Sequence, residues 1–313
     1  MLRTFLIRAA RAIGVLLVST FMCFVLTFGN GPGIARAVVG IRASEKDAAR
    51  KLAELGLDRP LLEQYWSWLT GALHGDLGRS FFTGQSVVNA LSARAPVTLG
   101  ITAVVIVLTA IIAVLLGVGA ATRGGWIDRL IQFLSVFANA FPSFVLAIIL
   151  TFVFAVSLRW LPATGYVPIE KGIGPWLASI ALPSITLLVG SVTSAAQQFR
   201  AATIETLSRD FVRTLRARGV PEWQVIFKNV LRNSAGPGLT VLSLTVFGVL
   251  GGAVFIEQIF ALPGLGKLGV DSAVKGDVPM LMGSVLVTIL VVLIVNFIGD
   301  MANTALNPKT RAK

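Results

Sequence analysis

Charged residues are scarce in this sequence. Of its 313 residues, 13% are Asp, Glu, Lys or Arg, about half of the roughly 25% that is usual in soluble domains. Hydrophobic residues make up 55%, which excludes an intrinsically disordered chain. The single cysteine, Cys23, excludes a disulfide framework, and the single histidine, His74, excludes the paired-histidine zinc motif of metalloproteases. The composition that remains is that of a membrane protein.

Six apolar segments are long enough to cross a membrane. A hydrocarbon core of about 30 Å needs about 20 apolar residues in a helix. The predicted spans are residues 12–28, 97–121, 130–158, 176–196, 237–260 and 280–304. Pro142 predicts a kink inside the third.

The first span resembles a cleaved signal peptide in its flanks. Basic residues precede it, and Ala35-Arg36-Ala37 follows it like a cleavage site. Its apolar run is longer than that of a usual signal peptide, and five further spans follow. We therefore expect the segment to be retained as the first span.

Lys and Arg are distributed unevenly over the loops. With the N-terminus inside, the inside segments hold fifteen cations and five acids, and the outside segments hold twelve cations and ten acids. Cytoplasmic loops carry an excess of Lys and Arg, so both termini are predicted to be cytoplasmic. The net charge of +12 is thereby assigned to membrane topology. No zinc-finger or RNA-binding motif accompanies it that would indicate a nucleic-acid partner.

The external segment 30–96 is too long to be a simple connection. Ser44 can cap a helix that Gly56 ends, and Pro60 can open a second helix rich in aromatic residues. Such residues favour the membrane–water boundary. The segment is interpreted either as a helical cap over the bundle or as a contact with an extracellular partner. His74 lies here without companion ligands, so no metal site is expected.

The pattern of the internal segment 200–236 predicts two amphipathic helices separated by Gly219-Val220-Pro221. Gly219 can take a left-handed conformation at the end of the first helix, and Pro221 can start the second. A loop held near anionic lipid would need no such turn. The pattern favours a rigid knob that docks into a cytoplasmic protein.

Several blocks of this sequence resemble one family. The segments RTLRARG at 213–219 and PEWQVIFKNVLRN at 221–233 resemble the coupling loop of ATP-binding-cassette importer permeases, of the first-subunit type of the dipeptide/oligopeptide/nickel subfamily. Further matching blocks are LGLDRP at 55–60, GDLGRS at 75–80, RAPVTL at 94–99, WLPATG at 160–165, FALPGLG at 260–266 and NP at 307–308. The sequence departs from the general permease motif, which has Glu-Ala-Ala where this chain has Arg213-Thr214-Leu215, and Leu-Pro where it has Leu231-Arg232.

The resemblance implies an all-α membrane protein. Its fold would be a bundle of six transmembrane helices of the type I importer permease, with a cytoplasmic coupling helix and an external helical loop domain. The expected organisation is a tail and first span at 1–29, the external loop at 30–96, the core permease at 97–304 with the coupling loop at 200–236, and a cytoplasmic tail at 305–313.

The resemblance also implies roles for particular residues and partners. Asp210, Arg213, Arg216, Gly219 and Glu222 would couple the chain to ATPases, and Glu257, Pro263, Gly264 and Gly266 would belong to an external gate. The implied partners are a second permease subunit, two cytoplasmic ATP-binding-cassette ATPases, an extracytoplasmic substrate-binding protein and membrane lipid. The location would be the bacterial inner membrane.

No catalytic motif is present in the chain. Segment 261–267 lacks the first glycine of a phosphate-binding loop, and Leu268 replaces the required Ser or Thr. We expect no catalysis and no directly bound cofactor, with ATP and Mg²⁺ used by partner subunits.

Polar residues inside spans are candidates for a translocation path or for hydrogen bonds between helices. These are Asn139, Gln197, Gln198 and Asn296. The scarcity of intramembrane charge argues against proton- or sodium-driven transport. Gly248, Gly251 and Gly252 are expected to permit close helix packing.

The function predicted is the permease subunit of an ATP-driven peptide importer that works by alternating access. Three alternatives stay open. They are an importer of nickel chelates or other small solutes, a secondary transporter that needs no nucleotide, and a membrane-anchored scaffold.

Overall fold

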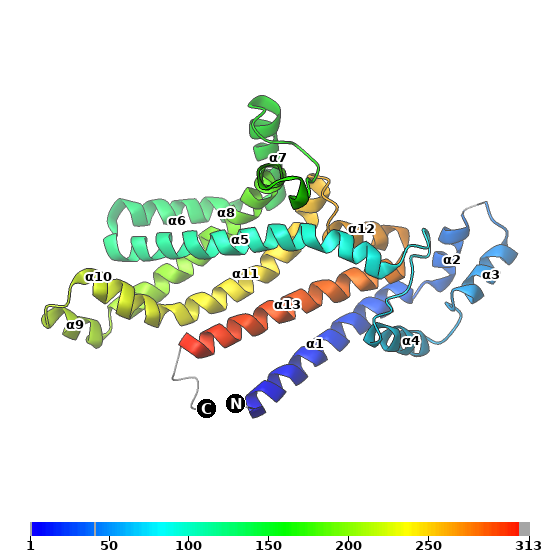
Figure 1. The fold of residues 1–313 in the computed structure, drawn as a ribbon, viewed down its shortest axis with the longest axis horizontal. Coiled ribbons are helices and arrows are strands. Elements are labelled where there is room, and N and C mark those ends of the chain that lie inside the picture. The colour runs from blue at the N-terminus through cyan, green and yellow to red at the C-terminus, as the bar shows by residue number, and fades with distance from the viewer. Residues whose placement is uncertain (1, 41, 307–313) are drawn as a thin grey trace. The chain divides into compact units, whose positions relative to one another are not determined.

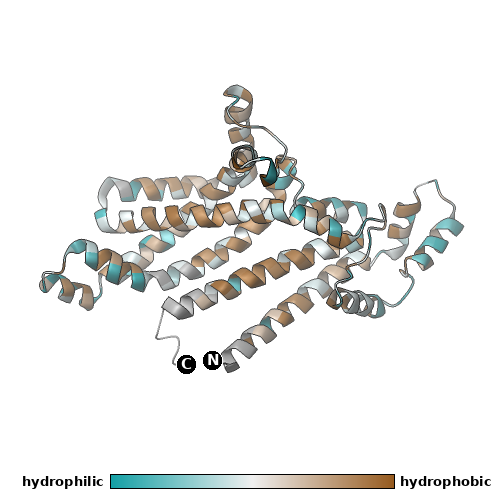
Figure 2. Cartoon of the chain, viewed as in Figure 1, coloured by the Kyte–Doolittle hydropathy of each residue, from teal (hydrophilic) through white to brown (hydrophobic). Residues whose placement is uncertain are grey.

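The computed structural model describes residues 2–40 and 42–306, and these residues form helices joined by short loops. Among these residues, five helices are long and apolar enough to cross a membrane, and a bent pair supplies a sixth span if it is counted as one. The five are α1 (Leu2–Phe28), α5 (Val87–Arg123), α8 (Ile173–Leu207), α11 (Leu231–Ile259) and α13 (Val278–Leu306). Figure 2 shows hydrophobic residues along these helices and hydrophilic residues in the loops and short helices. The predicted all-α membrane fold is confirmed.

The third predicted span is broken rather than kinked. Helix α6 (Gly125–Ala140) ends before Pro142, and α7 (Ser143–Leu150) continues into a π-helical segment, η1 (Thr151–Ser157). The two parts are bent by 99°. Phe141 is extended, with φ −100° and ψ 125°, because proline excludes the helical conformation from the residue before it. Proline thus set the position of the bend, and the extended residue in front of it made the bend far larger than a kink.

The backbone contacts divide the chain into two units, and the first contains residues 1–98 and 263–293. Besides α1 it holds α2 (Gly31–Val39), α3 (Glu45–Glu54), α4 (Leu61–Leu73) and α12 (Leu265–Lys275). One core cluster joins buried residues of the N-terminal segment to the start of α13, namely Phe24, Ile34, Leu57, Tyr65, Val278 and Met282. A second packs the start of α5 against α12 and α13. The external loop is therefore packed with the start of α13, far along the sequence. The predicted domains, divided at residue 96, place these two segments apart.

Local turn chemistry in the first unit follows the predictions. Ser44 caps α3, and its hydroxyl oxygen accepts from the amide of Asp47. Gly56 has φ +67° and follows the end of that helix, where Leu57 N donates to Leu52 O in the pattern of a Schellman motif. Pro60 precedes α4 and holds its N-cap position.

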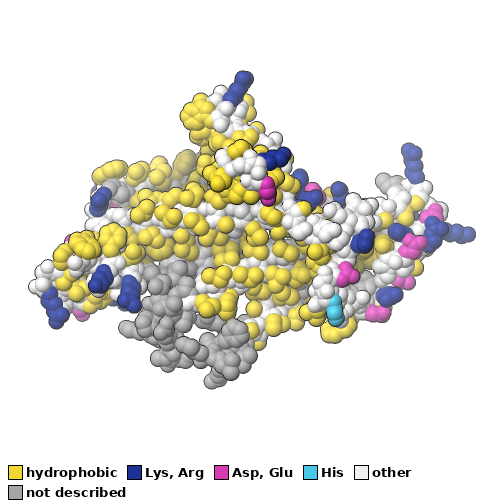
Figure 3. All heavy atoms as spheres, viewed as in Figure 1, with side chains coloured by type: hydrophobic (Ala, Val, Ile, Leu, Met, Phe, Trp, Pro, Cys, Tyr) yellow, Lys and Arg dark blue, Asp and Glu magenta, His cyan; other side chains and the backbone are white. Residues whose placement is uncertain are grey.

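The second unit contains residues 99–262 and 294–313, of which the structure describes those up to 306. Its centre is the packing of α8 against α11, with α6 and α7 also on α8. Gly117 permits α5 to approach α8, since a Cβ there would lie 2.7 Å from the Ala196 carbonyl oxygen. The unit also holds the 3₁₀ turn η2 (Ile169–Lys171), α9 (Asp210–Ala217), α10 (Glu222–Gln224) and the π-helical segment η3 (Val225–Val230). Figures 1 and 3 place α9 and α10 at the far end of α8 and α11, where Lys and Arg side chains gather on the visible face.

Candidate functional site

The loop between α8 and α11 forms the predicted knob. Gly219 has φ +75°, a conformation that L side chains rarely adopt. Its amide donates to Arg216 O at 3.0 Å, and the Val220 amide donates to Leu215 O at 3.1 Å. These two bonds form a Schellman motif, which closes α9 and reverses the chain within three residues. Pro221 then takes the N-cap position of α10. The sequence predicted Pro221 as the first residue of this helix, so the helix begins one residue later than predicted.

The knob has a small apolar core of its own. Val212 from α9 and Val225 and Val230 from η3 are fully buried. Around them pack Leu207, Phe211, Leu215 and Val220. Val220 and Leu215 thus supply the apolar contact that accompanies a Schellman motif. The core fixes α9 against η3, so the loop is a compact element rather than a flexible connection.

An ion pair closes the knob on its outer side. The Arg216 guanidinium donates to both carboxylate oxygens of Glu222, at 3.1 Å and 2.5 Å. This hydrogen bonding lowers the pKa of Glu222 and raises that of Arg216. Both side chains are about half exposed, so the pair is worth about 1 kcal/mol or less. Arg213 and Asp210 are 3.8 Å apart and largely exposed, which leaves both accessible to a partner.

The last part of the knob is the π-helical segment η3, which continues into α11. Sequence reasoning predicts an amphipathic helix from Glu222 onwards, and the structure instead places only one turn of α-helix, α10, before η3. The Asn229 side chain donates to Gln224 O at 3.2 Å. Trp223 and Phe227 are exposed. The spacing of apolar residues in the sequence does not distinguish a π-helical segment from an α-helix.

The residues predicted for an external gate occupy unlike positions. Glu257 is completely buried near the end of α11, where its carbonyl accepts from Leu262 N at 2.9 Å. Pro263 is exposed, and Gly264 is the N-cap of α12. Gly266 is half-buried within α12. Glu257 belongs to the second unit and the other three belong to the first.

A buried carboxylate that sequence reasoning missed anchors the external loop. Asp277, at the start of α13, is 6% exposed. Its carboxylate accepts from the Ser80 hydroxyl at 2.5 Å and from the Phe81 amide at 3.1 Å. Ser80 and Asp277 are 197 residues apart, so no local pattern could have paired them.

The polar residues predicted to line a path come from different helices. Gln197 and Gln198 are exposed on α8, and Asn296 is half-buried on α13. The Asn139 side chain lies outside the described part of the chain. One turn beyond the glutamines, the Arg200 guanidinium donates to both carboxylate oxygens of Asp128 on α6. This pair ties α6 to α8.

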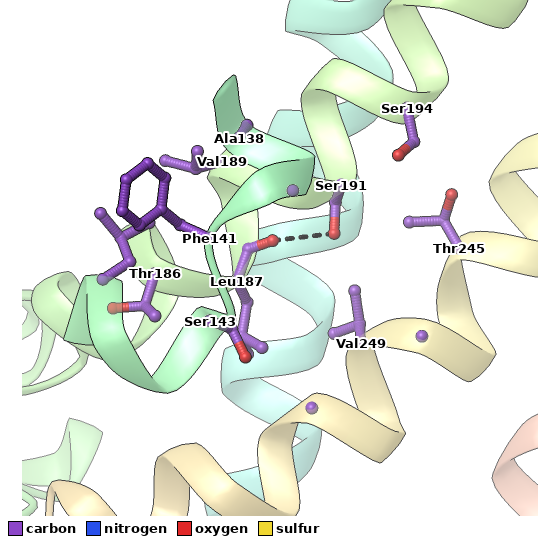
Figure 4. Close-up of a pocket in the computed structure, with 14 residues that line it drawn as sticks. Ala138, Phe141, Ser143, Thr186, Leu187, Val189, Ser191, Ser194, Thr245 and Val249 are labelled. Atoms are coloured by element: carbon purple, nitrogen blue, oxygen red, sulfur yellow. Dashed lines mark hydrogen bonds between the residues drawn. The ribbon is translucent and has the colours of Figure 1, made fainter. Parts of the chain in front are cut away.

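A cavity of about 290 Å³ lies beside the break between α6 and α7. It is bordered by Phe141 and Ser143 at the break and by residues of α8 and α11 (Figure 4). The described lining carries no charged side chain, and its polar groups are the hydroxyls of Ser143, Thr186, Ser191, Ser194 and Thr245. In Figure 4, Ser194 and Thr245 point toward each other from α8 and α11.

Three of these hydroxyls already donate to their own helix. Thr186 donates to Leu182 O, Ser191 to Leu187 O and Thr245 to Val241 O, at 2.8 to 2.9 Å. A hydroxyl whose proton is used in this way still offers acceptor lone pairs. The cavity therefore presents neutral acceptors, which suit solutes with N–H groups.

The predicted glycine packing is confirmed at one of three positions. A Cβ at Gly252 would lie 2.9 Å from the Leu187 side chain. At Gly248 and Gly251 it would meet nothing within 4 Å. Gly248 lines the cavity, so its missing side chain leaves open space there.

Comparison with known proteins assigns the chain to one family along nearly its whole length. The family model described as "Binding-protein-dependent transport system inner membrane component" matches residues 113–312. The N-terminal model for membrane components of the same systems matches residues 1–102.

Relatives of similar length agree with this. A protein of Brucella abortus assigned by name to a peptide transport system as its permease is 35% identical over 97% of both chains. A protein of Sinorhizobium fredii named for a peptide ABC transporter permease is 35% identical over 90% of both. The glutathione transport system permease protein of Pectobacterium atrosepticum is 35% identical over 100% of both. This chain belongs to the family of binding-protein-dependent transport system inner membrane components, and it is an integral membrane permease of the inner membrane.

Proposed function

We propose that this chain is the non-catalytic permease subunit of an ATP-driven importer that carries peptides. The full-length similarity to permeases named for peptide and glutathione transport supports the substrate class. The neutral, acceptor-lined cavity supports it physically, because peptides share backbone N–H donors whatever their side chains. The described lining has no charged group, so it would not select peptides by the charge of their side chains.

The knob from α9 to η3 is the proposed site of energy input. Its own core and Schellman turn make it rigid, and a rigid element is needed to transmit a displacement. Asp210, Arg213, Arg216, Gly219 and Glu222 would form the docking face or hold its shape. One of the two ATPase subunits that bind ATP and Mg²⁺ would dock here, and closure of the two ATPases would move the knob.

We infer the rest of the assembly from the family and from the charge distribution. The excess of Lys and Arg in the loops predicts that both termini and the knob are cytoplasmic. The external loops would then receive solute from a substrate-binding protein. A second, related permease would pair with this one and complete the pathway, so that ATP binding and hydrolysis alternate the access of the cavity.

Reconstitution of the intact complex in liposomes tests this proposal. Uptake of a labelled dipeptide or of glutathione should require ATP inside the liposome together with the ATPases and the binding protein. Equal uptake without ATPase subunits would show a secondary transporter instead. Absence of peptide uptake together with ATP-dependent uptake of a nickel chelate would overturn the substrate class alone.

The role of the cavity has a matched pair of variants on α11. Gly248→Leu fills open space in the cavity, whereas Gly251→Leu places the same side chain in open space that is not part of the cavity lining. Gly248→Leu should reduce uptake strongly while binding-protein-stimulated ATP hydrolysis persists. Gly251→Leu should have little effect. Equal uptake by the two variants would remove this cavity from the path.

A further inference from the structure

Helix α4 has three distinct faces, and each face is a stripe of residues that recur at helical spacing. Residues four, seven and eleven positions apart lie on one side of a helix. The first stripe consists of Leu61, Tyr65, Trp68 and Ala72, the second of Leu62, Trp66, Leu69 and Leu73, and the third of Glu63, Ser67 and Thr70. A helix of a globular domain needs only two faces, one for the core and one for water.

The first stripe faces the protein. Tyr65 is buried, and Leu61 and Trp68 pack against the same core cluster. The Tyr65 hydroxyl lies 3.0 Å from the Thr20 hydroxyl and donates to Leu17 O at 3.2 Å. Its ring makes edge contacts with Phe21 and Phe24 of α1. Helix α4 is thus fixed beside α1, as Figure 1 shows.

The point of attachment lies within a membrane span. The apolar span of α1 runs from Ala9 to Phe28, and Thr20 is eight residues before its end. At a rise of about 1.5 Å per residue, that is about 12 Å along the helix. Because Tyr65 is held at this level, α4 lies at the depth of lipid acyl chains and headgroups rather than in the surrounding water.

Three of the four residues of the second stripe have no cover within the described chain, whereas Leu69 packs against the core cluster. Leu62, Trp66 and Leu73 are 69%, 66% and 78% exposed. The third stripe is polar, and Glu63 pairs with Arg59 at 3.7 Å. An apolar stripe beside a polar stripe, with a tryptophan among its members, is the pattern of a helix that lies in the membrane interface.

We propose that α4 is an in-plane membrane anchor, with Leu62, Trp66 and Leu73 inserted among the lipids that surround α1. The third stripe then faces the aqueous boundary. Lipid is the occupant because the stripe adjoins a span that is itself in lipid, and α4 is bonded to that span inside its apolar length. The anchor would fix the depth at which the loop between α1 and α5 meets the solution. This inference depends on membrane insertion and not on which solute is carried.

Photo-crosslinking in native membranes tests the anchor in the complete complex. A benzophenone amino acid is placed singly at positions 62, 66 and 73, and at positions 63, 67 and 70 as matched controls on the same helix. After illumination, phospholipid adducts should be several-fold more abundant at the first three positions. The residues at positions 62, 66 and 73 are bulky and exposed, and positions 63 and 67 are exposed while position 70 is half-buried. Insertion of each variant is checked by its yield in the membrane fraction.

Three outcomes would overturn the proposal. Crosslinks from positions 62, 66 and 73 to the binding protein or to the second permease would show that a protein covers the stripe. Equal lipid yields on the two stripes would show that α4 has no preferred face. Lipid adducts at neither stripe, with a span residue such as Leu26 reacting normally, would place α4 in water.

Discussion

The turn at Gly219 offers the sharpest test of the knob, because a side chain there strains the backbone without a steric clash within the chain. Gly219 has φ +75°, and a Cβ at this position would meet nothing within 4 Å. Within this chain, any effect of a side chain must therefore come from the left-handed backbone, which costs an L-residue about 1–2 kcal/mol. Asn tolerates this conformation better than Ala, and β-branched Val tolerates it worst. At 1.4 kcal/mol for each factor of ten, Gly219→Val should deplete the native turn by about tenfold or more.

Two assays separate the shape of the turn from its function. Hydrogen exchange should show the Val220 amide, which donates to Leu215 O, losing protection in the order Asn, Ala, Val. In reconstituted complexes, the number of ATP molecules hydrolysed for each solute imported should rise in the same order, with membrane insertion unchanged. Normal protection and normal transport in Gly219→Val would refute the reasoning. Loss of protection with unchanged transport would retain the turn and reject the coupling role.

Three further predictions follow from single contacts. Arg216 lowers the pKa of Glu222, so the ion pair stabilises the knob above the ordinary carboxyl pKa, and this stabilisation is lost as pH falls through the lowered value. Amide exchange of segment 209–230, corrected for intrinsic rates, should therefore become faster at low pH in the wild type and not in Glu222→Gln. Ala261 has φ +51°, so Ala261→Gly should raise thermal stability in detergent by up to about 1 kcal/mol, and a decrease would show that the strain is absent. Asp277→Ala removes the acceptor of the Ser80 hydroxyl proton and of the Phe81 amide, so it should lower stability by about 1–3 kcal/mol in the same melt. Asp277→Asn should be milder because its amide oxygen still accepts, and an Ala variant that melts like the wild type would contradict the anchor.

Local chemistry was the part of this fold that the sequence could predict. Ser44, Gly56 and Gly219 each act through the backbone of their own turn, so the residue type carries the information. The long apolar helices were predictable for the same reason, since hydrocarbon requires about 20 residues in each. Pro142 identified the place where the third span changes direction, and it did not reveal a bend of 99°.

Contacts between distant segments could not be predicted. Asp277 sits among ordinary loop residues, and only the fold brings it to Ser80. The hydroxyls of the cavity were overlooked because Ser and Thr in a span usually bond to their own helix, as Thr186 and Ser191 do. Attention to larger amides therefore selected Gln197 and Gln198, which are not among the residues that line the cavity.

Helix α11 connects the two ends of the proposed mechanism. The knob continues through η3 directly into α11 at Leu231, and the same helix lines the cavity with Thr245, Gly248, Val249 and Gly252. From Leu231 to Gly248 the helix rises about 25 Å at 1.5 Å per residue. A displacement of the knob would therefore reach the cavity through one continuous element, without passing through a chain of side-chain contacts. Because α11 forms one wall of the cavity, its movement would change the width of the space while leaving the acceptors of α8 in place. Gly248 presents no side chain that would fill that space. A permease that receives its solute already selected needs such a change of width more than it needs a tight site of its own.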